Sequence, residues 1–311
     1  MAYYDELAVS VETVESIYEP LDNNRKEFRI LHVGPGTNFH DTLDCTLETI
    51  LSLQKPTPAY VAISYCWGEI TGYETIRLNG RFHEVPSSAA VVLRQFRGHG
   101  LPLWIDALCI NQADIMERNS QVLLMGQIYS SCSECFIWLG DSDENTSSVF
   151  KAMELIYDER YGKQKNSFGC SPLRGNTLLI AALGICPLEH FFAFFRRSWF
   201  TRVWVVQEAA LAPGAICYCA SLSIDCDVVR VAGLWIYNNM PPLKLGFTIP
   251  LSAFSTMSFL NAIRGHSTGV WQPQKLEDLL ACTFVLVLPM FEIISMVFSH
   301  SWSGTNPSPS T

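Results

Sequence analysis

The stretch Tyr60-Val-Ala-Ile-Ser-Tyr-Cys-Trp-Gly68 decides the fold class, because a short apolar run ends there in a polar and aromatic cluster. A second stretch, Leu103-Trp-Ile-Asp-Ala-Leu-Cys-Ile-Asn-Gln112, has the same character. Short apolar runs of this kind are buried strands in α/β proteins, and the residues that follow their carboxyl ends line the ligand crevice. We therefore expect a candidate site where these two strands end.

Strand and helix patterns alternate around these two stretches. The predicted strands cover 28–33, 43–53, 60–65, 103–106 and 135–139. The predicted helices cover 86–97, 114–130, 147–157, 178–183, 188–197 and 199–210. This order predicts an α/β domain with a mainly parallel sheet flanked by helices, with helical additions.

A β-hairpin is predicted from the pair Asn79-Gly80, which lies between short strands over 74–78 and 81–85. Asn followed by Gly suits the positive φ angles of a type I′ turn. We expect this hairpin to be an antiparallel addition to the sheet.

The helix over 114–130 has two faces in its sequence pattern. The face expected to point to the core carries Ile115, Val122, Met125, Ile128 and Tyr129. The face expected to point to solvent carries Asp114, Glu117, Arg118 and Gln121. The phenylalanines at 191, 192, 194 and 195 are interpreted as core in preference to an interaction face.

The amino-acid composition limits the classes of protein to which this chain can belong. The chain of 311 residues is about half hydrophobic and only 16% charged, so it can bury a substantial core. Its net charge of −9, with no cluster of Lys and Arg, argues against nucleic acid as a partner.

The 11 cysteines are odd in number, and the chain starts without a basic-then-apolar signal segment. Reduced thiols and a cytoplasmic location are therefore expected. The Cys132 and Cys135 pair has no second pair at matching distance, so packed thiols are favoured over a metal site. No cofactor is expected.

Several blocks together resemble the fungal heterokaryon incompatibility (HET) domain. They are Ile63-Ser-Tyr-Cys-Trp-Gly68, Ile76-Arg-Leu-Asn-Gly80, Leu103-Trp-Ile-Asp-Ala-Leu-Cys-Ile-Asn-Gln112, Glu117-Arg118, Gln121-Val122, Met125, Ile128-Tyr129, Ile137-Trp-Leu-Gly140 and Trp199-Phe-Thr-Arg-Val-Trp-Val-Val-Gln-Glu208. The resemblance covers about residues 28–215. It implies a role in self/non-self recognition and regulated cell death after fusion of unlike cells. The expected partners are a second copy of the chain or another incompatibility protein.

The resemblance also suggests how the chain is divided. We expect a loosely ordered leader over 1–25, the HET domain over 26–215, an incomplete extension of it over 216–283, and an apolar then disordered tail over 284–311. The family's Leu-Leu run begins as Leu276-Glu-Asp-Leu-Leu280 and is then replaced by an apolar stretch, so a misread gene end beyond about Thr283 is our hypothesis. The apolar stretch over 284–298 is shorter than the ~20 residues that a membrane span needs, and a buried segment is favoured over an anchor.

HET domains are distantly similar to Toll/interleukin-1 receptor (TIR) domains, which implies a TIR-like fold here. Ala62-Ile-Ser-Tyr65 resembles the first TIR strand. Trp204 and Glu208 keep the tryptophan-to-glutamate spacing of the TIR helix whose glutamate cleaves NAD in the enzymatic members. Val205 stands where that pattern has a cysteine. The resemblance therefore makes Glu208 the candidate catalytic residue and NAD the candidate substrate.

The chemistry of Glu208 has two interpretations. On a helix over 199–210 it would share a face with Trp204, and a carboxylate against an aromatic wall can stabilise a cationic sugar as nicotinamide leaves. Alternatively, Glu208 is a structural carboxylate paired with Arg202 or Arg197.

The other candidate substrate-binding residues follow the two strand ends. Asp106 needs a donor, water or ligand because an unpaired buried carboxylate is costly. Trp67 can stack a flat ring, and Gly68 lets backbone approach a ligand. The set is Ser64, Tyr65, Trp67, Gly68, Asp106, Asn111 and Trp204. A structural role stays open for each of them, and for Asn111 the bracing of its own loop is favoured.

Overall fold

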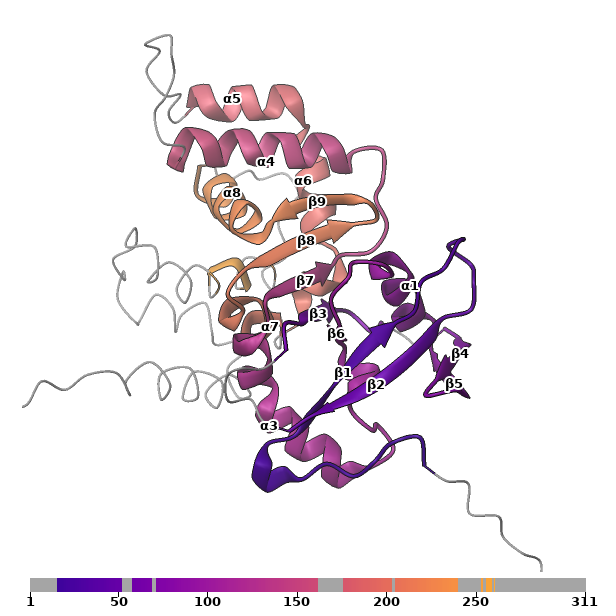
Figure 1. Ribbon diagram of the computed structural model, residues 1–311. Coiled ribbons are helices and arrows are strands. Elements are labelled where there is room, and N and C mark those ends of the chain that lie inside the picture. The colour runs from indigo at the N-terminus through magenta and orange to yellow at the C-terminus, as the bar shows by residue number, and fades with distance from the viewer. Residues whose placement is uncertain are drawn as a thin grey trace, which may run out of the picture.

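The computed structural model of the chain describes residues 16–51, 58–68, 71–161, 176–202, 205–239, 253, 256–258 and 260. Within them nine strands form one sheet, which Figure 1 shows running through the molecule. The strands are β1 (Phe28–Val33), β2 (Asp44–Ile50), β3 (Val61–Tyr65), β4 (Tyr73–Leu78), β5 (Arg81–Pro86), β6 (Leu103–Trp104), β7 (Glu134–Trp138), β8 (Ala215–Cys219) and β9 (Leu222–Asp225).

The sheet is mixed, with the strand order β5-β4-β2-β1-β6-β3-β7-β8-β9. The central strands β6, β3, β7 and β8 are parallel, whereas β1 pairs antiparallel with β2 and β6, and β8 pairs antiparallel with β9. The α/β class is confirmed, but the prediction of a mainly parallel sheet is wrong for the sheet as a whole. The reason is that β1–β2 and β8–β9 are joined directly, without the crossover that a parallel pair requires.

The hairpin prediction is confirmed. Strands β4 and β5 pair antiparallel from Leu78↔Arg81 to Tyr73↔Pro86. Asn79 and Gly80 have φ angles of 51° and 79°, as a type I′ turn requires.

The helices surround this sheet. They are α1 (Ser87–Phe96), α2 (Asp106–Cys109), α3 (Ile115–Ser131), α4 (Thr146–Tyr161), α5 (Asn176–Ile185), α6 (Leu188–Phe195), α7 (Val205–Leu211) and α8 (Cys226–Asn239), with 3₁₀ turns η1 (Asn23–Arg25) and η2 (Ser198–Thr201). The single helix predicted over 199–210 is wrong. Arg202 ends η2 with an extended backbone, φ −88° and ψ 137°, so the chain changes direction before α7 begins.

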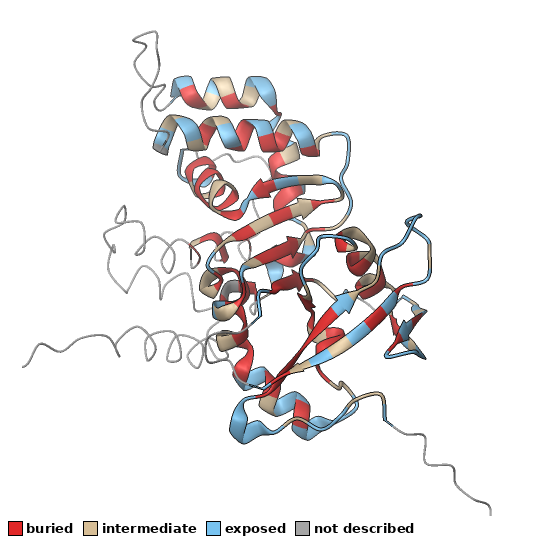
Figure 2. Cartoon of the chain, viewed as in Figure 1, coloured by how far each residue is buried: buried red, intermediate tan, exposed pale blue. Residues whose placement is uncertain are grey.

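Aromatic side chains fill the space between the helices and the sheet. Phe96 of α1 contacts Phe136 of β7 and Tyr218 of β8, with ring centroids 5.0 Å apart in each pair. Strand β3 is buried along its whole length (Figure 2). The predicted core cluster of α6 is confirmed, because all four of its phenylalanines are buried: Phe191, Phe192, Phe194 and Phe195.

The faces predicted for α3 are partly wrong. Glu117 and Gln121 are 7% and 0% exposed, whereas Ile115 and Val122 are 60% and 37% exposed. The helix is therefore rotated so that two polar residues face inward and two apolar residues face outward. Asp114 caps its start, accepting from the backbone N–H of Met116 and Glu117 at 2.9 and 3.1 Å.

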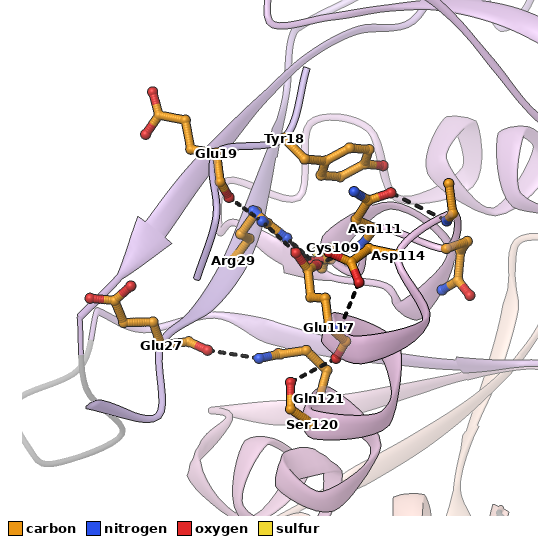
Figure 3. A network of polar contacts seen from close by, with 12 residues as sticks. Tyr18, Glu19, Glu27, Arg29, Cys109, Asn111, Asp114, Glu117, Ser120 and Gln121 are labelled. Carbon is orange, nitrogen blue, oxygen red and sulfur yellow. Dashed lines mark hydrogen bonds and ion pairs between the residues drawn. The ribbon is translucent and has the colours of Figure 1, made fainter. Parts of the chain in front are cut away.

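A buried arginine explains this rotation. Arg29 of β1 is 2% exposed, and its Nη1 and Nη2 donate to the two carboxylate oxygens of Glu117 at 2.6 and 3.0 Å (Figure 3). The same guanidinium donates to the carbonyls of Cys109 and Glu19. One turn further along α3, Gln121 Nε2 donates to the Glu27 carbonyl at 2.8 Å. Polar groups of β1 and of the residue before it thus select the face of α3 that packs inward.

Two further observations concern the remaining segments. None of the helices in the described residues is by itself long and apolar enough to span a membrane, and only α5 and α6 together reach the necessary length and composition, with a 78° bend between them. The predicted apolar tail over 284–311 lies outside the described residues, as do residues 1–15 of the predicted leader.

The Arg29–Glu117 pair generates a stability prediction. We expect Arg29→Met to lower the free energy of unfolding by about 3–5 kcal/mol, since it leaves a buried carboxylate without its partner. The double variant Arg29→Met/Glu117→Leu is expected to be less destabilised than the single variant. Urea unfolding measures both.

The control is Arg25→Met, which removes an exposed pair with Asp22 and is expected to change stability by less than about 1 kcal/mol. Equal decreases in the free energy of unfolding for Arg29→Met and Arg25→Met would show that breaking the buried pair is no more destabilising than breaking an exposed one.

Candidate functional site

Two predicted site residues meet where the parallel strands β6 and β3 end side by side. Asp106 begins α2 directly after the β6 region, and Trp67 follows β3 by two residues. The Trp67 indole Nε1 donates to both carboxylate oxygens of Asp106, at 3.1 Å each. The contact joins neighbouring strand ends at the edge of the sheet where α/β proteins place ligands.

Ser64 connects β3 with the segment that contains η2 and α7. Its Oγ accepts a hydrogen bond from Trp199 Nε1 at 2.7 Å and donates to Oε2 of Glu208. Ser64 is fully buried and Glu208 is 3% exposed. The structure therefore brings Ser64 and Glu208 into contact inside the protein although 144 positions separate them in the sequence.

Arg202 and Tyr65 lie beside this contact. The Arg202 Nη1 donates to the carbonyl of Tyr65, the last residue of β3. The Tyr65 hydroxyl is buried and has no hydrogen-bond partner among the described residues. Burial raises the pKa of this hydroxyl well above its ordinary value, so it stays protonated. A buried hydroxyl without a partner costs about 1–3 kcal/mol, which a ligand that accepts its hydrogen bond would offset.

The carboxyl groups of this region hold their protons more tightly than usual. Burial raises the pKa of Glu208 from 4.5 to about 7, and the charge of Asp106 adds to the shift, while Arg202 and the Ser64 hydroxyl oppose it. Burial also raises the pKa of Asp106, with the Trp67 hydrogen bond and Arg202 acting against the change. Near neutral pH Glu208 therefore exchanges between its neutral and ionised forms.

The remaining predicted residues have different surroundings. Gly68 has a φ of 65°, which disfavours any side chain there although no heavy atom lies within 4 Å of the Cβ position. Asn111 Oδ1 accepts from the Ala113 N–H at 3.2 Å, and the Asn111 N–H donates to Glu117 at 2.7 Å, so this residue braces the loop before α3. Trp204 lies outside the described residues.

The nearby Cys109 is buried, and the surroundings of its thiol decide its reactivity. Burial raises the pKa of the Cys109 thiol to about 12, which keeps it protonated and unreactive. Within the described part of the chain, no three or more His, Cys, Asp or Glu residues gather as metal ligands would. A separate hollow of about 840 Å³ is lined by residues of 16–20, β1, β2, β5 and the β4–β5 turn, and includes none of the predicted site residues.

Comparison with known proteins gives the family. The sequence model of the heterokaryon incompatibility protein (HET) family matches residues 60–208. The chain contains a HET domain. The matched segment begins at Tyr60, next to β3, and ends at Glu208, so it includes both sides of the Ser64–Glu208 contact.

A curated relative supports the assignment. Heterokaryon incompatibility protein 6, OR allele, of Neurospora crassa is 29% identical over 86% of this chain. The chain spans about half the length of that relative, 46%. No solved structure matches this chain at a significant level.

Two residues of the HET domain site were not among the predicted site residues. Trp199 donates to Ser64, and Arg202 holds the end of β3. Both stand in the same motif as Glu208, Trp199-Phe-Thr-Arg-Val-Trp-Val-Val-Gln-Glu208. On the continuous helix predicted over 199–210, their side chains would have pointed to a different side of the helix from Glu208. The signal available in the sequence was a fully buried strand serine, which needs both a donor and an acceptor nearby.

The raised pKa of Glu208 generates a pH prediction for the HET domain. Between pH 4.5 and about 7 the folded chain keeps the proton that the unfolded chain has lost, so this group makes the free energy of unfolding fall as pH rises. Glu208→Gln removes that dependence. We expect the stability of the variant relative to the unmodified chain to increase by up to about 3 kcal/mol across this window.

Urea unfolding at several pH values measures the difference. Glu154→Gln, at an exposed position of α4, serves as the matched control and is expected to leave the pH dependence unchanged. If Glu208→Gln and Glu154→Gln gave parallel curves, the carboxyl of Glu208 would titrate normally in the folded protein.

Proposed function

We propose that this chain is a cytoplasmic cell-death effector of heterokaryon incompatibility, and that its HET domain acts by hydrolysing NAD with Glu208 as the catalytic carboxylate. The heterokaryon incompatibility role is supported by the family match and by the name of the Neurospora relative. The chemical part rests on one observation, the buried Glu208 carboxyl with its raised pKa, held by Ser64 at a strand end. The distant TIR resemblance of residues 62–65 and 204–208 supports it further, and a TIR-like outline of the fold is part of the same proposal.

The proposed reaction breaks the bond between ribose C1′ and the nicotinamide nitrogen. The bonding electrons leave with nicotinamide, which departs as a neutral molecule, and C1′ becomes an oxocarbenium-like centre. Ionised Glu208 stabilises this positive charge, as carboxylates do in glycoside hydrolysis. Water then adds to C1′ and releases a proton, so the products are ADP-ribose, nicotinamide and a proton.

Neighbouring groups have complementary roles in this proposal. The Ser64 hydroxyl orients the Glu208 carboxyl, and the unpartnered Tyr65 hydroxyl donates to an oxygen of the substrate. Trp67, held by Asp106, offers a ring for stacking. Because Glu208 is 3% exposed, the proposal requires neighbouring groups to move before the substrate reaches it.

The low exposure of Glu208 also favours an alternative function. The Glu208 carboxyl is already bonded to Ser64 and nearly closed to solvent, as expected of a polar contact that only joins β3 to α7. In this alternative the HET domain is a non-catalytic interaction domain that signals or kills by self-assembly.

An enzymatic assay separates the two functions. Purified full chain is incubated with NAD, and nicotinamide release is followed by chromatography. We expect release by the unmodified protein, and a loss of about a hundredfold or more for Glu208→Gln, because the amide cannot stabilise a cation. Glu154→Gln should keep full activity.

The pH dependence of nicotinamide release is an independent test of the role of Glu208. Activity at low NAD concentration is expected to rise with pH up to about 7, as Glu208 ionises in the free protein. Absence of nicotinamide release from folded protein that kills cells would reject hydrolysis and leave the self-assembly function. If the Glu208→Gln variant kept full toxicity in cells, the proposed role of Glu208 would be rejected as well.

A further inference from the structure

Helix α3 presents an apolar stripe to solvent. The stripe consists of Ile115, Met116, Val122 and Leu123, which are 60%, 77%, 37% and 64% exposed. At 100° per residue these four positions, with the exposed Asn119 between them, fall within an arc of about 120° of the helix surface. They therefore lie on one face of the helix, as two apolar pairs on either side of Asn119; Figure 2 shows exposed bands on this helix.

The stripe is not a by-product of an incompletely buried core face. The inward face of α3 is already occupied by Glu117 and Gln121, which β1 and the residue before it hold, and by Leu124, Met125 and Ile128. Two pairs of apolar side chains exposed on one helix face are costly in water, and exposed apolar patches mark contact surfaces.

The spacing of the stripe is symmetric about Asn119. Ile115 and Leu123 stand four residues before and after it, and Met116 and Val122 stand three before and after. When two identical helices cross antiparallel on a two-fold axis at Asn119, each apolar residue meets an apolar residue of the other copy. Self-complementarity of this kind is what a two-fold interface requires.

We propose that the α3 stripe binds the α3 stripe of a second copy of this chain, antiparallel across a two-fold axis that passes near Asn119. Ile115 packs on the partner's Leu123, Met116 packs on the partner's Val122, and the two Asn119 amides face each other on the axis. A polar amide at the centre of an apolar helix contact sets the register of the two helices.

The size of the stripe sets the strength of this dimer. From Ile115 to Leu123 the helix rises about 12 Å, so the contact is smaller than the ~800 Å² per partner of a stable complex. Dissociation in the micromolar range follows, and the chain is expected to pair only when its concentration rises. The net charge of −9 on each copy opposes association, so added salt should strengthen it.

The proposal does not depend on NAD hydrolysis, because it uses no residue of the Ser64–Glu208 site. Sedimentation velocity of the purified full chain over a concentration series tests it. We expect a monomer–dimer equilibrium that Leu123→Glu shifts toward monomer by at least tenfold in dissociation constant. Ile180→Glu is the matched control, since Ile180 is 71% exposed on α5 and should leave the equilibrium unchanged.

A cross-linking experiment tests the two-fold axis itself. In a background with Cys66, Cys170 and Cys282 replaced by serine, Asn119→Cys is expected to form an intermolecular disulfide under mild oxidation. Ser130→Cys lies on the same side of the helix but about 16 Å beyond Asn119, so the two-fold axis would hold its two copies far apart, and it is expected to remain monomeric on non-reducing gels.

Three outcomes would overturn the proposal. The first is a full chain that stays monomeric through the micromolar range. The second is a dimer that Leu123→Glu and Ile180→Glu affect equally. The third is a monomeric chain whose activity in cells is lost with Leu123→Glu, which would assign the stripe to another protein or to an apolar segment of the same chain.

Discussion

The buried ion pair between Arg29 and Glu117 positions much of the domain. It ties β1 to α3, and through the carbonyl of Cys109 and the N–H of Asn111 it also holds the loop between α2 and α3 (Figure 3). Desolvation makes such a pair a weak source of net stability, but breaking it is expensive, so it acts mainly to select one arrangement. That arrangement fixes the rotation of α3 and leaves its apolar stripe facing solvent.

The candidate site depends on the parallel centre of the sheet. Because β6 and β3 run in the same direction, Asp106 and Trp67 emerge at the same edge and bond to each other. Glu208 reaches β3 from a distant part of the chain, after η2 has turned the backbone at Arg202. Its contact with Ser64 joins the first and last parts of the family match.

Local patterns predicted those parts of the fold whose causes are local. Asn79-Gly80 predicted its turn because positive φ is a property of those two residues alone. The apolar run before Trp67 and the phenylalanines of α6 predicted burial, since each segment is too apolar to be exposed. The prediction of the buried face of α3 was partly wrong because Arg29, 88 positions away in the sequence, binds the Glu117 carboxylate inside the protein. The prediction of one continuous helix over 199–210 was wrong because tertiary contacts of Trp199 and Arg202 outweighed helix propensity.

The sequence by itself determined the α/β class, the hairpin and the HET domain. These follow from side-chain period and from φ preferences, which act over a few neighbouring residues. Only the tertiary structure decided that the sheet is mixed, that Ser64 is the residue that meets Glu208, and that α3 turns Ile115 and Val122 outward. Each of these depends on pairing between groups far apart in the chain, and burial is the main cause that shifts the pKa of Glu208 toward neutrality.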